Sequence, residues 1–201
     1  MEIVIFLLIL LFSAILHEIA HGYVAERLGD PTARLAGRLT LNPKNHIDPI
    51  MSVLLPLILL ISGSPIIFGA AKPVPVDPFN LRDGRKDMAL VSLAGPLTNI
   101  MIAIAASLLL RILPFPEIQG FLFMVVHLNL LLAIFNLLPI PPLDGSKVFS
   151  LLLPGKMADA FLSLGSIGFL IIFFLLLSPG TFSLGRIIST LLTFSERLLG
   201  F

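Results

Sequence analysis

Two histidines and a glutamate near the N-terminus have the residue types and the spacing to activate water on a metal ion. They are His17, Glu18 and His21, in the order His-Glu-Ile-Ala-His. Positions i and i+4 of a helix share one face, so both imidazoles can reach a single ion. Zinc lowers the pKa of bound water to about 7, and the carboxylate of Glu18 can then accept its proton. The pattern therefore predicts a hydrolytic zinc site on a helix.

A hydrolytic zinc site needs a third protein ligand and keeps its fourth position for water. The chain has no cysteine, so histidine, aspartate and glutamate are the candidates. Away from the first helix, His127 and Asp144 lie in or beside apolar segments. Asp144 follows a proline-rich break and begins a new half-helix, where the positive end of the helix dipole favours a carboxylate. By itself, Asp144 is equally consistent with an ordinary N-cap at a wet interface.

The His-Glu pattern also has a simpler explanation, in which the helix emerges at the membrane surface and its polar residues are solvated. Tyr23, Glu26 and Arg27 follow shortly after and are compatible with such an exit. Against this explanation, a charge at the centre of a membrane helix costs roughly 2.5–3.5 kcal/mol. Three polar groups at ligand spacing on an apolar helix therefore favour a metal site.

The composition assigns the chain to the membrane. Of its 201 residues, 57% are hydrophobic and 12% are charged, and the mean hydropathy is +1.04. A soluble domain carries a charged fraction of about 25%. The net charge of +1 gives no basic excess for a nucleic-acid partner. The expected surroundings are a lipid bilayer.

The apolar segments predict an all-α polytopic membrane protein with about five to six transmembrane helices in a single domain, residues 1–201. Residues 182–199 are expected to be helical and either to span the membrane or to lie at its surface. Residues 34–41 and 72–76 form either ordinary loops or a short β element whose edge could receive an extended peptide. The expected spans are residues 3–26, 88–110, 118–138 and 158–177, with a short helix at 143–153.

The distribution of positive charge predicts the orientation. Segments 27–48 and 72–87 each carry four Lys or Arg residues, which favours the cytoplasmic side for both. One full span between them would separate them, so we expect 49–71 to be a re-entrant hairpin turning near Gly63 to Pro65. The N-terminus and the turn at 112–117 then lie outside. The C-terminus is cytoplasmic if 182–199 spans.

A second motif lies downstream, where residues 136–145 read Asn-Leu-Leu-Pro-Ile-Pro-Pro-Leu-Asp-Gly. Together with His17–His21 it resembles the site-two protease family of intramembrane metalloproteases, which combines a His-Glu-x-x-His helix with an Asn-x-x-Pro-x-x-x-x-Asp-Gly segment. Gly95, Pro96 and Asn99 resemble a further Gly-Pro-x-x-Asn element of that family. The resemblance covers residues 13–150 and is similar to the short bacterial and archaeal branch, without PDZ or CBS domain.

The resemblance implies a role for each matching residue. His17, His21 and Asp144 would bind one Zn²⁺ per chain, and Glu18 would be the general base and later the proton donor. Asn136 would hydrogen-bond the substrate carbonyl and the developing oxyanion, whereas Gly95 and Asn99 are expected to serve close helix packing. The catalytic core would be residues 1–153, followed by C-terminal helices at 158–199.

The implied activity is hydrolysis of peptide bonds within or near transmembrane segments of membrane proteins. The implied location is a prokaryotic plasma membrane, with the active site toward the cytoplasm. A metal-ion or proton transporter and a catalytically silent scaffold of the same fold remain as alternatives. His46 is either a solvated turn histidine or a residue that approaches the site. His127 is expected to form an interhelical hydrogen bond rather than to bind the metal.

Overall fold

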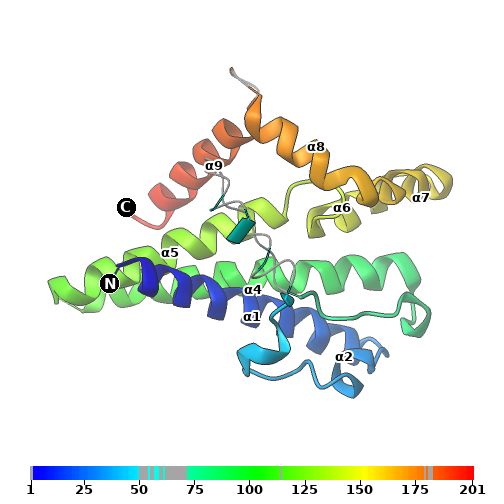
Figure 1. The fold of residues 1–201 in the computed structure, drawn as a ribbon, viewed down its shortest axis with the longest axis horizontal. Coiled ribbons are helices and arrows are strands. Elements are labelled where there is room, and N and C mark those ends of the chain that lie inside the picture. The colour runs from blue at the N-terminus through cyan, green and yellow to red at the C-terminus, as the bar shows by residue number, and fades with distance from the viewer. Residues whose placement is uncertain are drawn as a thin grey trace.

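The chain folds into helices connected by loops (Figure 1). This computed structural model describes residues 2–49, 72–113, 115–178 and 183–201, together with the isolated positions 54, 57, 58, 61 and 180. Within those ranges no residue belongs to a β-strand. The all-α prediction is confirmed for these residues, and the β element expected at 34–41 and 72–76 does not form. Residues 32–35 instead form the short helix α2 (Thr32–Leu35).

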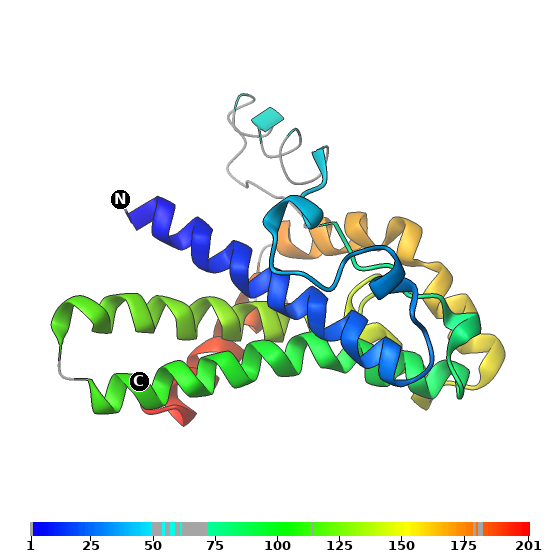
Figure 2. The same cartoon turned by 90° about the horizontal axis from the view of Figure 1, so that it is seen from below.

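Three long helices form the centre of the molecule: α1 (Glu2–Arg27), α4 (Gly84–Ile112) and α5 (Pro116–Asn136). They lie side by side, with α4 antiparallel to both α1 and α5 (Figures 1 and 2). Each is long and apolar enough to cross a membrane. The helices expected at 3–26, 88–110 and 118–138 are therefore confirmed. Helix α4 begins earlier than expected because the carboxylate of Asp87 accepts the N–H of Asp83 (2.8 Å) at its first turn.

The segment expected to span the membrane at 158–177 is divided. It forms α7 (Gly155–Ser163) and α8 (Gly165–Leu177), with a bend of 72° between them. Gly168 allows α8 to pack against the preceding loop, since a Cβ there would lie 1.8 Å from the carbonyl oxygen of Pro141. The described residues thus contain three helices able to span a membrane, or up to four if α7 and α8 form one span. Five to six were expected.

The last helix, α9 (Leu184–Leu198), packs along α5 in the opposite direction. His127 of α5 pairs with Glu196 of α9 (Nδ1 to Oε1, 2.7 Å), as the interhelical prediction for His127 requires. The guanidinium of Arg111 donates to the carbonyl of Leu199 (2.7 Å) at the end of α4. The C-terminus therefore lies at the same end of the bundle as the 112–117 turn. A cytoplasmic C-terminus was expected only if 182–199 spans the membrane. Helix α9 is not among the helices long enough to span, so the sides of the C-terminus and of this turn stay predictions.

The two basic segments meet at the opposite end of the bundle. The guanidinium of Arg38 donates to the carbonyls of Lys72 (2.6 Å) and Pro73 (3.3 Å). The carboxylate of Asp30 accepts the N–H of Asp77 (2.8 Å) and the amide of Asn80 (3.0 Å). The connection from α1 to α4 therefore leaves and returns at one end, as a re-entrant segment would. The hairpin itself, with its turn near Gly63 to Pro65, lies outside the described residues and stays a prediction.

Asp30 is the centre of this junction and is fully buried. Burial by itself would raise the pKa of its carboxyl group. Hydrogen bonds from the side chains of Thr32 and Asn80, and from the N–H groups of Asp77 and Thr32, outweigh burial and lower that pKa. Asp30 is therefore ionised near neutral pH and holds residues 77–80 against the end of α1.

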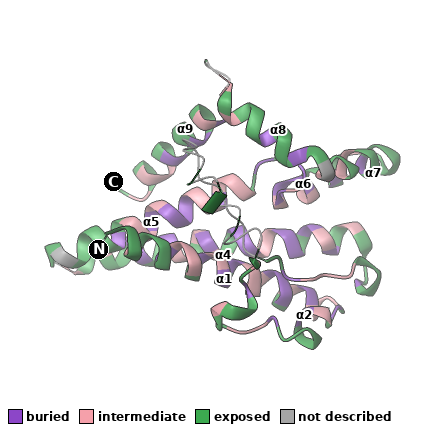
Figure 3. Cartoon of the chain, viewed as in Figure 1, coloured by how far each residue is buried: buried purple, intermediate pink, exposed green. Residues whose placement is uncertain are grey.

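In the three-helix bundle, exposed residues cover much of the outer faces, and buried residues lie between the helices (Figure 3). Large apolar side chains on the outer faces are exposed, among them Ile3, Met101 and Phe121. Several polar side chains are buried between the helices: Ser13, His17, His21, Asn99 and Asn129. Polar groups inside membrane helices are costly and usually mark a functional site. The inner face of the bundle is therefore where chemistry is expected.

Candidate metal centre

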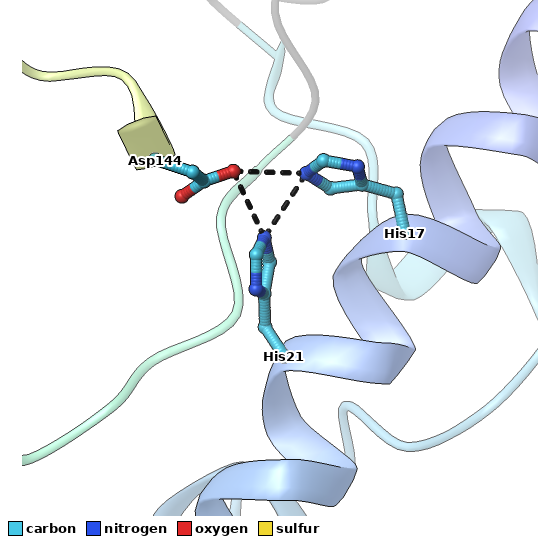
Figure 4. A group of neighbouring side chains, drawn as sticks. All are labelled: His17, His21 and Asp144. Atoms are coloured by element: carbon cyan, nitrogen blue, oxygen red, sulfur yellow. Dashed lines mark hydrogen bonds and ion pairs between the residues drawn. The ribbon is translucent and has the colours of Figure 1, made fainter. Parts of the chain in front are cut away.

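Three side chains from two separate elements converge on one point (Figure 4). Helix α1 supplies His17 and His21, and the first residue of α6 (Asp144–Phe149) supplies Asp144. The Nε2 atoms of the two histidines are 3.0 Å apart. The Oδ2 atom of Asp144 lies 3.2 Å from each of them. Among the described residues, these three form the group whose ligand atoms lie close enough to hold one metal ion.

The other ring nitrogen of each histidine has a fixed partner. Nδ1 of His17 lies 2.6 Å from the side-chain oxygen of Asn99. Nδ1 of His21 lies 2.7 Å from the carbonyl oxygen of Val91. Both partners are acceptors, so both Nδ1 atoms carry the proton of the neutral imidazole. The Nε2 lone pairs of both histidines consequently face each other and the carboxylate of Asp144.

This geometry fits a zinc ion. Three electron-pair donors within 3.2 Å of one another repel unless a metal ion or a proton lies between them. Tetrahedral zinc with nitrogen and oxygen ligands at 2.0–2.2 Å holds them about 3.3 Å apart. The three measured separations are close to that value. The donors are also of the kinds found in catalytic zinc sites, with one coordination position left for water.

The proline-rich loop that follows α5 determines where Asp144 lies. Helix α5 ends at Asn136, and the proline-rich loop returns the chain so that Gly145 rests on the backbone of Leu137. A Cβ on Gly145 would lie 2.1 Å from the carbonyl oxygen of Leu137, so only glycine permits this contact. The second carboxylate oxygen of Asp144 lies 3.5 Å from Nζ of Lys147. Oδ2 is thereby left to face the two histidines.

Gly95 of α4 gives the ring of His17 its space. A Cβ at this position would lie 2.5 Å from Nε2 of His17 and 2.6 Å from both Cδ2 and Cε1. The ring cannot move away from such a Cβ without losing either its hydrogen bond to Asn99 or its direction toward Asp144.

We expect Gly95→Ala to weaken zinc binding by about 10- to 100-fold, the usual loss when the support of a metal ligand is disturbed. The measurement is a zinc titration against a competing chelator in detergent.

Gly120→Ala is the matched control for this prediction. Gly120 also lies in a membrane helix, and a Cβ there would meet nothing within 4 Å. Alanine is a better helix former than glycine, so neither substitution should unfold its helix. Zinc binding by Gly95→Ala as tight as that of Gly120→Ala would show that the ring of His17 is not confined by α4.

Glu18 lies in the same turn of α1 as His17 and His21. Its Oε2 atom accepts the N–H of Val74 (2.7 Å), so the segment that enters α4 passes beside the three-residue group. Gly22 allows this approach, because a Cβ there would lie 2.9 Å from a methyl carbon of Val74 and 2.7 Å from one of Leu39. The carboxylate keeps Oε1 as a second acceptor.

Asn136 is not brought into hydrogen-bond contact with the three-residue group. It is the last residue of α5, half-buried, and its side-chain amide donates to the carbonyl of Leu132 (3.0 Å) in its own helix. Its proposed role toward the substrate carbonyl stays a prediction.

His46 and Asn99 differ from their sequence expectations. His46 is buried in its turn, where Nε2 bonds the carbonyl oxygen of Thr40 (2.7 Å), so it is not a solvated histidine. Asn99 was expected only to help the helices pack, yet it holds Nδ1 of His17. An asparagine in an apolar helix was the available signal, but sequence alone did not reveal its partner.

Comparisons with known proteins find one matching family and several relatives that carry zinc metalloprotease names. The sequence pattern of peptidase family M50 matches residues 113–177. "Putative zinc metalloprotease YwhC" of Bacillus subtilis is 36% identical over 180 residues, which cover 85% of this chain and 78% of that protein. "Putative zinc metalloprotease Rip2" of Mycobacterium tuberculosis is 37% identical over 139 residues, covering 67% of this chain and 52% of the relative. No solved structure matches the chain.

Proposed function

Since this chain belongs to peptidase family M50, the site-two protease family that its motifs resemble, we propose that it is an intramembrane zinc metalloprotease. Its substrates are membrane proteins, cut within or near a transmembrane segment. The observation that carries the proposal is the convergence of His17, His21 and Asp144 inside a bundle of membrane-length helices. Glu18 in the same helical turn adds the base that hydrolysis requires.

The proposed mechanism assigns each step to a side chain of this protein. When bound by His17, His21 and Asp144, zinc supplies Lewis acidity, which acidifies water and polarises a carbonyl group. Glu18 accepts the proton of the attacking water on Oε1, while the N–H of Val74 holds Oε2. Glu18 then returns the proton to the leaving amine. The second N–H of the Asn136 side chain is available to the developing oxyanion.

We place the active site toward the cytoplasmic side of the membrane. His17 and His21 lie in the second half of α1, near the end where both basic segments meet. Positive residues in short loops favour the cytoplasm. A substrate helix would have to unwind to reach the site, because its peptide groups are hydrogen-bonded and surrounded by hydrocarbon. Single-span membrane proteins are the simplest substrates of this kind.

Metal analysis combined with a cleavage assay tests the proposal. The protein purified in detergent should contain about one zinc ion per chain and should cleave a model single-span substrate. Removal of zinc by a chelator should abolish cleavage, and added zinc should restore it, because the three ligands hold the ion that acidifies water. Absence of zinc from the purified protein would contradict the proposal. Zinc flux into proteoliposomes without any cleavage would favour the transporter alternative.

A further inference from the structure

A chain of buried amide groups leads away from His17 into the bundle. Asn99 of α4 and Asn129 of α5 are both fully buried. The side-chain nitrogen of Asn99 donates to the side-chain oxygen of Asn129 (2.9 Å) and lies 3.4 Å from the carbonyl of Ser13. The oxygen of Asn99 faces Nδ1 of His17 (2.6 Å). Asn129 is thus connected to the metal centre through one intermediate residue.

At the end of this series of amide groups that is farther from His17, the direction of the hydrogen bonds is fixed. The side-chain nitrogen of Asn129 donates to the backbone carbonyl of Val125 (2.9 Å) and to the hydroxyl of Ser13 (3.0 Å). A backbone carbonyl can only accept, so the nitrogen of Asn129 must face Val125 and its oxygen must face Asn99. The nitrogen of Asn99 must then face Asn129, and its oxygen must face His17. Each bond sets the direction of the next.

The orientation of Asn99 decides which nitrogen of His17 carries the proton. With the oxygen of Asn99 toward the ring, Nδ1 is protonated and Nε2 has a free lone pair for a metal. With the amide reversed, its nitrogen would require Nδ1 as acceptor. Nε2 would then be protonated and unable to bind zinc. An asparagine amide has nearly the same shape in both orientations, so only its hydrogen-bond partners distinguish them.

We propose that Asn129 is a positioning residue, which selects the metal-binding tautomer of His17 by orienting the amide of Asn99. The hydrogen bonds of the Asn129 side chain go to Asn99, Ser13 and Val125, so it acts on His17 only through Asn99. Its effect is strong because all three side chains are buried, so water cannot take over a lost hydrogen bond. The inference rests on the proposed zinc chemistry of the site and extends it to a residue that no motif includes.

The tautomer can be measured directly in the metal-free protein. With ¹⁵N-labelled histidine, NMR in detergent should show His17 protonated at Nδ1, its signal being assigned by its loss in His17→Gln. Asn129→Leu removes the nearer of the two oxygens that orient Asn99, leaves the more distant carbonyl of Ser13 at 3.4 Å, and keeps an apolar helix. In this variant we expect a mixture of Nδ1-H and Nε2-H forms of His17. We also expect zinc affinity to fall by about 10-fold or more, as for other supports of metal ligands.

A second substitution separates orientation from simple packing. Asn99→Asp presents an oxygen to His17 whichever way the side chain turns, so it no longer needs Asn129 for its direction. We therefore expect Asn129→Leu to lower zinc affinity in the wild-type background but hardly at all in the Asn99→Asp background. Gln119→Leu, an exposed position of the same helix, is the control for added apolar surface and should bind zinc as the wild type does.

Equal losses of zinc affinity in both backgrounds would assign Asn129 a merely structural role and overturn the inference. An unchanged Nδ1-H signal in Asn129→Leu would also overturn it. A wild-type protein that binds no zinc would contradict the proposed function instead. The tautomer measurement on the metal-free protein would still decide the role of Asn129 in that case.

Discussion

Glu18→Gln is expected to abolish peptide hydrolysis while leaving zinc bound. Glutamine has the shape of glutamate, and its oxygen can still accept the N–H of Val74, so the local structure is preserved. Its amide cannot accept a proton from water or return one to the leaving amine. Loss of a general acid–base group costs about 10²- to 10⁴-fold in rate, and a loss near the upper end is expected here because one residue would serve both steps. The measurement is the initial rate of cleavage of a single-span substrate, with zinc content determined on the same sample.

Glu26→Gln is the matched control for this substitution. Glu26 lies in the same helix, more than two turns further along, and pairs at the surface with Arg34. Exposed ion pairs contribute little to stability, so cleavage should continue at close to the wild-type rate. Cleavage by Glu18→Gln at the rate of Glu26→Gln would remove Glu18 from the mechanism. Cleavage lost together with zinc would mean that Glu18 supports the metal site instead.

Asp144→Ala is expected to have the largest effect on metal binding. It removes one of the three proposed ligands and leaves the Nε2 lone pairs of His17 and His21 without their negatively charged partner. Disturbing a residue that only supports a ligand already costs about 10- to 100-fold in metal affinity. Loss of a ligand should exceed this, so we expect zinc affinity to fall at least about 100-fold and cleavage to be lost at limiting zinc. Competition with a chelator of known affinity measures the change.

Asp159→Ala is the corresponding control, since Asp159 is an exposed aspartate of α7. It should bind zinc as tightly as the wild-type protein. If Asp144→Ala also kept wild-type affinity, Asp144 would not be a ligand, and the third ligand would have to come from elsewhere in the chain. Both variants should keep the helix content of the wild type, which circular dichroism in detergent would verify.

The amino-acid sequence by itself predicted the chemistry of the candidate site and the long helices that carry it. His17, Glu18 and His21 are neighbours in one helix, and helical spacing alone places the two imidazoles on one face. The membrane class followed from composition, and the long helices followed from uninterrupted apolar segments. Asp144 was a candidate because a proline-rich segment precedes it, and its role as a ligand was implied by the family resemblance. Such features depend on residues close together in the chain.

Only the tertiary structure decided which distant groups meet. The resemblance implied that Asp144 joins the two histidines, but the meeting of α1 with α6, and the contact of Asn99 in α4 with His17, are seen only in the folded chain. Nothing in local spacing revealed that Gly95 makes room for the His17 ring, or that Asn129 lies behind Asn99. The division of 158–177 was also not foreseen, and α8 packs through Gly168 against the backbone of Pro141, which precedes it by many residues. Hydropathy and spacing record local preference, whereas these contacts arise from how the helices pack.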